Sequence, residues 1–454
     1  MSTIKTKKNE IDMTTGPILK KMIAFAFPLM CSSILQLLFN AADTVVVGKF
    51  AGDNSLAAVG SNGSLINLMT NLFIGLSIGT NVLIGKSVGA NDKEHTVKLV
   101  HTSMTISVIG GIFLMIFGML FAERILILMD CPAEVLPLAS QYLTIYFIGL
   151  PAMMIYNFGS AVLRAVGDTK RPLYYLTAAG VINVIFNLIF VIGFKMDVAG
   201  VATATVISQV ISAILIISCL MHESGYIKLD LKNLSIDIDS LKRIVRIGIP
   251  AGIQGSLFSL SNVIIQSSIN SFGATVVAGS AAAQNIEGFT YVSMNSFHQA
   301  TLTFTSQNVG AGRFDRIGKI LLRGLILVTI TGITLGYMEI LFGHQLLGIY
   351  SNDSAVIEKG FERLLIMCGT HFLCGFMDVM VGSIRGIGYS VLPMIVSLIG
   401  ACGLRILWLK TFFMIDAFHT TRSIYITYPI SWFLTIIAHV ICYIIIRKKS
   451  CPSN

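Results

Sequence analysis

Acidic side chains inside long apolar runs are the residues of this sequence best placed to do chemistry. Of its 23 Asp and Glu residues, four lie in such runs: Asp43, Glu287, Glu339 and Asp378. A charge in the hydrocarbon core of a membrane is costly unless it is partnered, hydrated or neutralised. Glu339 is near the outer end of its run, where it could reach the membrane interface. The other three are candidates to bind a cation, a proton or a cationic ligand.

Asp43 has the polar neighbours that a cation site needs. At a rise of ~1.5 Å per helical residue, Asp43, Asn187 and Thr205 all fall within roughly 10 Å of the outer membrane surface. Asn183 and Asn187 are four residues apart and share one face of their helix. Carboxylate, amide and hydroxyl oxygens are ligands for Na⁺, and a desolvated carboxylate can instead carry a proton. The alternative is a hydrogen-bond cluster that only joins helices.

A second set of polar residues is predicted to bind an organic cation. Gln284 and Glu287 lie deeper in their helix than Asp43 does, and Glu287 is the carboxylate expected to attract a positive charge. Arg405 lies at a similar depth in another span, so a structural Glu287–Arg405 ion pair is the alternative. Asn40 and Asp378 complete the set of candidate substrate-binding residues.

The composition identifies the scaffold of these residues as membrane-spanning. The 454 residues are 54% hydrophobic and only 12% charged, with a mean hydropathy of +0.79. A soluble domain carries about twice that fraction of charge. Soluble enzymes, secreted disulfide scaffolds and nucleic-acid-binding proteins are therefore excluded, even though the net charge is +9. The cysteines and histidines lack the spacing typical of metal sites, and no cofactor is predicted.

Twelve apolar stretches are long enough to cross about 30 Å of hydrocarbon. Helices are expected because the stretches are continuous, whereas a barrel would show short alternating segments. Most of the 32 Lys and Arg residues, including Lys5, Lys7 and Lys8, lie at the termini or after even-numbered spans, so both termini are predicted to be cytoplasmic. The predicted spans are 23–47, 56–84, 97–121, 135–160, 172–194, 199–221, 244–269, 275–305, 320–342, 361–384, 391–415 and 424–446.

The sequence repeats itself at a shift of 221 residues. Val88-Gly89-Ala90 recurs as Val309-Gly310-Ala311, and Arg164-x-x-Gly167 recurs as Arg385-x-x-Gly388. Because each half holds an even number of spans, the halves have the same orientation, with a pseudo-two-fold axis along the membrane normal. This pattern predicts an all-α polytopic membrane protein, in which twelve transmembrane helices form two six-helix pseudo-symmetric bundles.

The predicted domain boundaries follow this repeat. Residues 1–221 form an N-terminal six-helix lobe, 222–240 a cytoplasmic linker, and 241–454 a C-terminal six-helix lobe. A cavity between the two lobes would suit alternating access.

Several motifs in this order resemble the multidrug and toxic compound extrusion (MATE) transporters over residues from about 17 to 446. Besides the two repeated motifs, they are Asn40-Ala-Ala-Asp43-Thr44, Asn183-x-x-x-Asn187 and Gly200-Val-Ala-Thr-Ala-Thr205. The resemblance implies export of organic cations or other amphipathic drugs, driven by inward movement of Na⁺ or H⁺.

By the same resemblance, Asp43, Asn183, Asn187 and Thr205 form the cation-coupling site of the N-terminal half, and they are the candidate Na⁺ ligands. The sequence departs from the family at Asn187, where many members have a second aspartate. The lower negative charge weakens the case for Na⁺ and leaves H⁺ coupling open.

The sequence therefore predicts a secondary active multidrug efflux antiporter of the plasma membrane, working by alternating access. It is expected to act as a monomer in the lipid bilayer, with small-molecule drugs or organic cations as its partners and no nucleic acid. The alternative is a flippase or exporter of a lipid-linked or other endogenous metabolite, which would need a wide and strongly cationic cavity. An intramembrane enzyme would need paired acidic motifs or a metal cluster, and a channel would not need the repeat.

Overall fold

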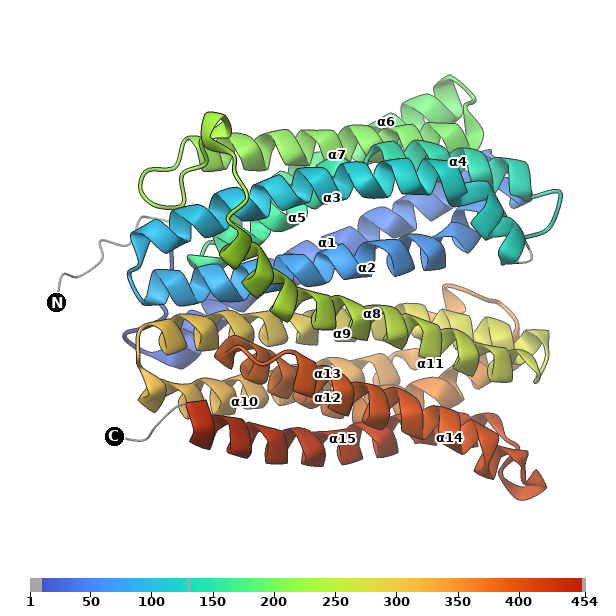
Figure 1. The fold of residues 1–454 in the computed structure, drawn as a ribbon. Helices are drawn as coiled ribbons and strands as arrows, with labels where there is room; N and C mark the ends of the chain where they lie inside the picture. Colours follow the sequence, from blue (N-terminus) through green and yellow to red (C-terminus); the bar gives the residue numbers. More distant parts are fainter. Residues whose placement is uncertain (1–9, 130, 451–454) are drawn as a thin grey trace. The chain divides into compact units, whose positions relative to one another are not determined.

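The structure is a computed structural model that describes residues 10–129 and 131–450, and all regular elements in these ranges are helices. Lys5, Lys7 and Lys8, on which the predicted orientation partly depends, lie outside these ranges. The first half contains α1 (Ile18–Phe50), α2 (Asp53–Gly89), α3 (Lys93–Leu128), α4 (Leu136–Ile148), α5 (Leu150–Ala165), α6 (Lys170–Asn187), the π-helix η1 (Leu188–Gly193) and α7 (Asp197–Met221) (Figure 1).

The second half follows a short 3₁₀ helix, η2 (Leu231–Asn233). It contains α8 (Ile238–Asn270), α9 (Ala274–Gly310), α10 (Phe314–Leu341), α11 (Gly343–Gly348), α12 (Ser354–Ile387), α13 (Val391–Ser397), the π-helix η3 (Leu398–Gly403), α14 (Leu404–Lys410), the 3₁₀ helices η4 (Phe412–Met414) and η5 (Asp416–Phe418), and α15 (Thr421–Ser450).

The helices account for the predicted membrane spans. Within the described residues, ten helical segments are long and apolar enough to cross a membrane, and α4 and α5, bent by 48°, together make an eleventh. Helix α9 has the length, 37 residues, but is too polar to qualify by composition. Many of its hydroxyls bond back to the helix, as Ser293 does to the Phe289 carbonyl (2.7 Å) and Thr303 to that of Gln299 (2.9 Å). With α9 included, the predicted twelve-helix fold is confirmed.

The backbone repeats in the same register as the sequence. Helices α2 and α9 are both 37 residues long. Gly52 and Gly273 precede them with φ of 90° and 92°. Gly167 and Gly388 also share the left-handed region, with φ of 92° and 114°. Glycine adopts this conformation without the strain that a side chain would cause. The two halves are therefore structural as well as sequence repeats, as predicted.

The helices pack into two compact units. Unit 1 comprises the described residues of Met1–Asp12 together with Cys31–Gly252, and unit 2 comprises Met13–Met30 and the described residues of Ile253–Asn454. In unit 1, α5 packs against α2, α3 and α7, while in unit 2, α12 packs against α9, α10 and α15 (Figure 1). The predicted lobes 1–221 and 241–454 follow the sequence repeat and stay a prediction.

Two helices, α1 and α8, change unit part-way along their length. The changes fall after Met30 and after Gly252, each two residues beyond a proline inside the helix, Pro28 and Pro250. Proline has no N–H and breaks one rung of the helical hydrogen-bond ladder. The bond pattern is therefore interrupted where each helix passes from one unit to the other.

The first part of α8 crosses α2 at a glycine contact inside unit 1. A Cβ atom at Gly75 would lie 2.3 Å from the backbone nitrogen of Gly252, and one at Gly248 would lie 2.5 Å from Cα of Leu76. Gly75 and Gly79 on α2, like Gly248 and Gly252 on α8, form the Gly-x-x-x-Gly spacing that lets membrane helices touch through their backbones.

The segment 222–240 is anchored to α3 rather than extending away from unit 1. Ile227 and Leu229 are buried in its core. The backbone N–H of Asp230 donates to His101 Nε2 (3.2 Å), and that of Asp237 donates to the Thr102 hydroxyl (3.0 Å). The Asp237 carboxylate accepts the Ser240 N–H at the start of α8 (2.8 Å), and this hydrogen bonding lowers its pKa.

Candidate functional site

Unit 1 brings together the four residues predicted to form a cation site. The Asn187 amide donates to Asp43 Oδ1 and to Asn183 Oδ1 (3.3 Å). Asn183 in turn donates to the Thr205 hydroxyl (3.4 Å), which donates to the Val201 carbonyl (3.0 Å). The side chains come from α1, α6 and α7 and form one connected hydrogen-bond chain, which we call the Asp43 chain.

The Asp43 chain has one buried acceptor without a donor. Asn187 is completely buried and Asn183 nearly so, whereas Asp43 and Thr205 are partly exposed. Asn187 Oδ1 receives no hydrogen bond from the described residues. A buried acceptor that receives no hydrogen bond costs about 1–3 kcal/mol, so a cation or a proton donor at this oxygen would be stabilising. The Asp43 chain therefore has one buried oxygen that is open to a cation or a proton donor.

The local backbone at Asn187 is unusual. This residue ends α6 and is followed directly by the π-helix η1. A π-helical turn is rare and is found mostly at functional sites. The second half has its own π-helix, η3, but there the neighbouring positions hold no counterpart of the Asp43 chain.

Two tyrosines that the sequence analysis did not single out lie near Asp43. Tyr142 and Tyr146 of α4 interact electrostatically with the Asp43 carboxylate. Their rings are stacked, with centroids 6.0 Å apart. They are spaced i, i+4 on one helix face, which is the signal that could have identified them as a pair, but their distance from α1 is a tertiary property.

The candidate substrate-binding residues are spread over both units. Asn40, in unit 1, is exposed one turn before Asp43, and its carbonyl accepts the Thr44 hydroxyl (3.0 Å). Gln284, Glu287 and Asp378 belong to unit 2. Gln284 is exposed on α9, whereas Glu287 is 5% exposed.

Glu287 forms an ion pair, but not with the expected partner. Arg363 of α12 binds both of its oxygens, through Nε (2.8 Å) and Nη2 (3.0 Å), and also donates to Ser280 (2.8 Å). Arg405 instead donates to Ser431 (2.8 Å) and lies over the Tyr428 ring, 4.0 Å from its centroid.

The alternative interpretation, an ion pair between Glu287 and Arg405, is therefore wrong, because the basic partner of Glu287 is Arg363. Helix α12 begins at Ser354, well before the predicted span 361–384, so Arg363 lies inside the helix and not at its end. Since Glu287 is buried and both its oxygens are bound, its geometry favours a structural role over drug binding.

Asp378 lies on α12 near the end that carries Arg385. It is partly buried, and its backbone carbonyl contacts His298 Nδ1 (2.6 Å). Arg385, two helical turns later, acts on its carboxylate electrostatically and donates to Gln254 Oε1 (2.7 Å). Asp378 thus has a cationic side chain nearby, whereas no basic residue in the described ranges acts on Asp43.

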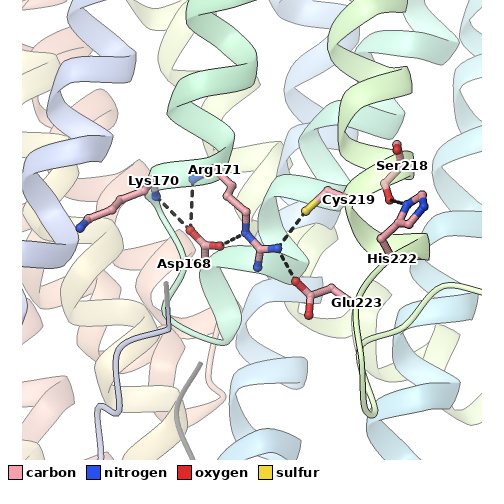
Figure 2. Close-up of polar contacts among 7 residues, drawn as sticks. All are labelled: Asp168, Lys170, Arg171, Ser218, Cys219, His222 and Glu223. Atoms are coloured by element: carbon pink, nitrogen blue, oxygen red, sulfur yellow. Dashed lines mark hydrogen bonds and ion pairs between the residues drawn. The ribbon is translucent and has the colours of Figure 1, made fainter. Parts of the chain in front are cut away.

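A further ion-pair network joins the α5–α6 loop to the end of α7 (Figure 2). Arg171 forms ion pairs with Asp168 and Glu223 and donates to the Cys219 sulfur (3.2 Å). Asp168 is fully buried and also accepts the N–H groups of Lys170 and Arg171 (both 3.1 Å) at the start of α6. The Arg171 guanidinium bridges the two carboxylates, so the network anchors the loop to the end of α7.

Comparison with known proteins gives matches over most of the chain. The family model MatE matches residues 28–189 and 250–409. The Bacillus subtilis protein named "Probable multidrug resistance protein YoeA" is 27% identical over 394 residues, covering 85% of each chain. The FAD transporter of Shewanella oneidensis is 23% identical, covering 80% of this chain and 81% of its own.

Solved structures share the fold. One described as the outward-facing conformation of a multidrug resistance MATE family transporter has a TM-score of 0.89 to this chain at 22% identity, and covers 98% of both chains. At that identity the likeness shows the arrangement of helices alone.

Proposed function

The chain belongs to the MatE family of transporters, and from this premise we propose that it is a secondary active exporter of drugs or other amphipathic organic cations, driven by H⁺ or Na⁺. Its relatives include proteins named for multidrug resistance and multidrug export. The proposed activity is antiport by alternating access, without an enzymatic step. We place the protein in the plasma membrane, as a monomer with both termini in the cytoplasm.

The observation that carries the coupling proposal is the Asp43 chain. In its ionised form, Asp43 accepts the Asn187 amide, which is a charge-assisted hydrogen bond. When Asp43 takes a proton, one of its oxygens becomes a donor. Asn187 Oδ1, which has no donor among the described residues, can then accept that proton if the amide turns over. Proton loading would therefore change the contact between α1 and α6.

The same oxygens fit Na⁺ as the alternative coupling ion. Asp43 supplies the charge, and the Asn183, Asn187 and Thr205 oxygens supply neutral ligands. A single carboxylate neutralises one monovalent ion, so H⁺ and Na⁺ are both compatible with the donor set. Residues of this chain would hold the ion, and no metal-ligating sulfur or imidazole is involved.

A second candidate function is the export of an endogenous metabolite. It is favoured by one relative in particular, which is named as an FAD transporter. An anionic cargo of that kind would require cationic groups along its path. In unit 2, Arg363 is bound by Glu287, and Arg405 by Ser431 and an aromatic ring, so neither guanidinium is available without rearrangement.

Transport into everted vesicles tests these proposals. Vesicles containing the protein would be given ethidium, and separately FAD, under an imposed pH gradient or an imposed Na⁺ gradient. We expect ethidium accumulation with at least one gradient and none without. Accumulation of FAD alone would favour the second candidate, and no gradient-driven movement of either would contradict both. Asp197→Asn, which neutralises an exposed carboxylate at the start of α7, is the matched control for Asp43→Asn.

A further inference from the structure

Glu339 is a buried carboxyl group that the proposed mechanism does not use. It lies on α10 and is 9% exposed. Its Oε1 accepts the Thr290 hydroxyl of α9 (2.7 Å). Its Oε2 is buried and, apart from the weak thiol donor of Cys368 beside it, has no hydrogen-bond donor among the described residues. This carboxyl therefore has one good hydrogen bond and no basic partner in that part of the chain.

The described residues of the helices packed around Glu339 leave it without a counter-charge. Helix α9 contributes Glu287, and α12 contributes Arg363 and Cys368. The Arg363 guanidinium already donates hydrogen bonds to both oxygens of Glu287 and to the Ser280 hydroxyl. On α11, the titratable group is His344, which contacts Glu358 (3.2 Å). His371 of α12, which interacts electrostatically with Glu287 and Arg363, is a further titratable group. While His371 is neutral, the net charge of the cluster is negative whenever Glu339 is ionised.

Glu339 contacts α9 farther from that helix's ends than its own position near the end of α10 indicates. It is close to the end of α10 at Leu341, but its partner Thr290 lies near the middle of α9. At the helical rise, Thr290 is ~24 Å from Ala274 and ~30 Å from Gly310. Helix α10 ends early beside the longer α9. One turn before Glu339, a Cβ at Gly336 would lie 2.3 Å from the Cys368 carbonyl, so α10 and α12 touch through their backbones.

From this geometry, we propose that Glu339 is a second proton-binding site, in unit 2, which is loaded and discharged in each transport cycle. An unpartnered charge at this depth is costly, so the carboxyl takes up a proton. The Thr290 hydroxyl supports the ionised form and keeps release accessible. The proton adds to a carboxylate oxygen and leaves from it, with no other bond changed.

This inference rests on the H⁺ branch of the proposed function, and it raises the number of exchanged protons from one to two. Purified protein in weakly buffered detergent solution would be mixed with tetraphenylphosphonium, a lipophilic cation, while a pH indicator counts the protons released. We expect two protons per bound cation in the wild type and one in Glu339→Gln or in Asp43→Asn. The double variant should release none. Glu358→Gln, which removes an exposed carboxylate of α12, should behave as the wild type.

The outcomes separate the two proposals. If Glu339→Gln releases as many protons as the wild type, or Asp43→Asn releases none, the second site is wrong while coupling at Asp43 stands. If the wild type binds the cation and releases no proton, H⁺ coupling itself fails.

Thr290→Val provides a test if Glu339→Gln does not fold. This variant keeps the Glu339 carboxyl group and removes the hydrogen bond that it accepts from Thr290. Because that bond supports the ionised form, its loss should shift the midpoint pH of one release step upward by about one unit or more. An unchanged midpoint would overturn the proposal.

Discussion

Within the described residues, Asp43 is the single carboxylate of the Asp43 chain, so one substitution removes the negative charge of the site. Asparagine has nearly the same shape as aspartate and leaves the packing unchanged. We predict that Asp43→Asn abolishes gradient-driven efflux while the protein remains folded, because an amide can neither release a proton nor neutralise Na⁺. Dye transport in everted vesicles and size-exclusion profiles would measure the two effects. Transport at wild-type rates would contradict the assignment, and Asp197→Asn should leave transport unchanged.

Asn187 sets the charge of the same site. Asn187→Asp places a second carboxylate against Asp43, and two adjacent negative charges attract a metal cation more strongly than one does. We predict that transport by this variant gains dependence on Na⁺ relative to the wild type. The rate at fixed pH gradient, measured over a range of Na⁺ concentrations, would show it. An identical Na⁺ dependence in the two proteins would mean that charge does not limit ion choice here.

Breaking the Glu287–Arg363 pair should lower the stability of the protein, and this effect can be distinguished from a loss of drug binding. Glu287→Gln strands the Arg363 charge in a buried environment and should cost about 3–5 kcal/mol. The double change Glu287→Gln with Arg363→Gln should recover much of this loss, whereas Glu287→Gln with Arg405→Gln should not. The fraction of monodisperse protein after heating in detergent would report it. Selective loss of cationic dye transport at unchanged stability would instead restore Glu287 as a drug-binding residue.

At the scale of elements, the crossing of α2 and the first part of α8 depends on glycine. We predict that Gly75→Leu disrupts their crossing, because even a single Cβ at this position overlaps the backbone of Gly252. Overpacking of this kind costs about 1–3 kcal/mol or more. Gly60→Leu on the same helix is the matched control, since a Cβ there meets no atom within 4 Å. Thermal stability in detergent should fall for the first variant and stay close to the wild type for the second.

The sequence predicts helices far better than it predicts their contacts. Length and hydropathy were sufficient for twelve spans, because crossing a membrane requires long apolar helices. They were insufficient for the start of α12 at Ser354, because its first turns are polar enough to resemble a loop. Arg363 therefore lay only two residues inside the predicted span 361–384, close to its end, and Arg405 was expected as the partner of Glu287 instead.

The Asp43 chain was predictable as a group because its residues share one depth, which can be counted along each helix. Its detailed geometry was not. The π-helix after Asn187 depends on a shift in backbone hydrogen bonds, and the nearness of the two tyrosines to Asp43 depends on how α4 packs against α2, α3 and α7. Neither property can be predicted from the spacing of residues in the sequence. The position of Glu339 beside the middle of α9 was not predicted for a similar reason, since it depends on where α10 ends beside α9.

For the whole molecule, the predicted orientation can be tested at two exposed loops. In a background without native cysteines, Gly225→Cys lies in the segment between α7 and α8, and Asp416→Cys lies in η5, between α14 and α15. If the termini are cytoplasmic, a membrane-impermeant maleimide should label the first site only in everted vesicles and the second only in right-side-out vesicles. The reverse labelling would invert the proposed topology.

The exchange of helix segments between the units has a consequence for how the protein is made. Unit 1 needs the part of α8 that ends at Gly252, and unit 2 needs residues 13–30, which precede nearly all of unit 1 in the chain. A ribosome delivers the chain from the N-terminus, so the first six spans enter the membrane before the glycine face of α2 has its partner. The start of α1 must meanwhile wait for α9, whose Asn308 donates to the Met13 carbonyl and whose Phe304 contacts Phe25. Neither half of this duplicated protein can mature as a separate nascent module, although each carries its own copy of the repeat.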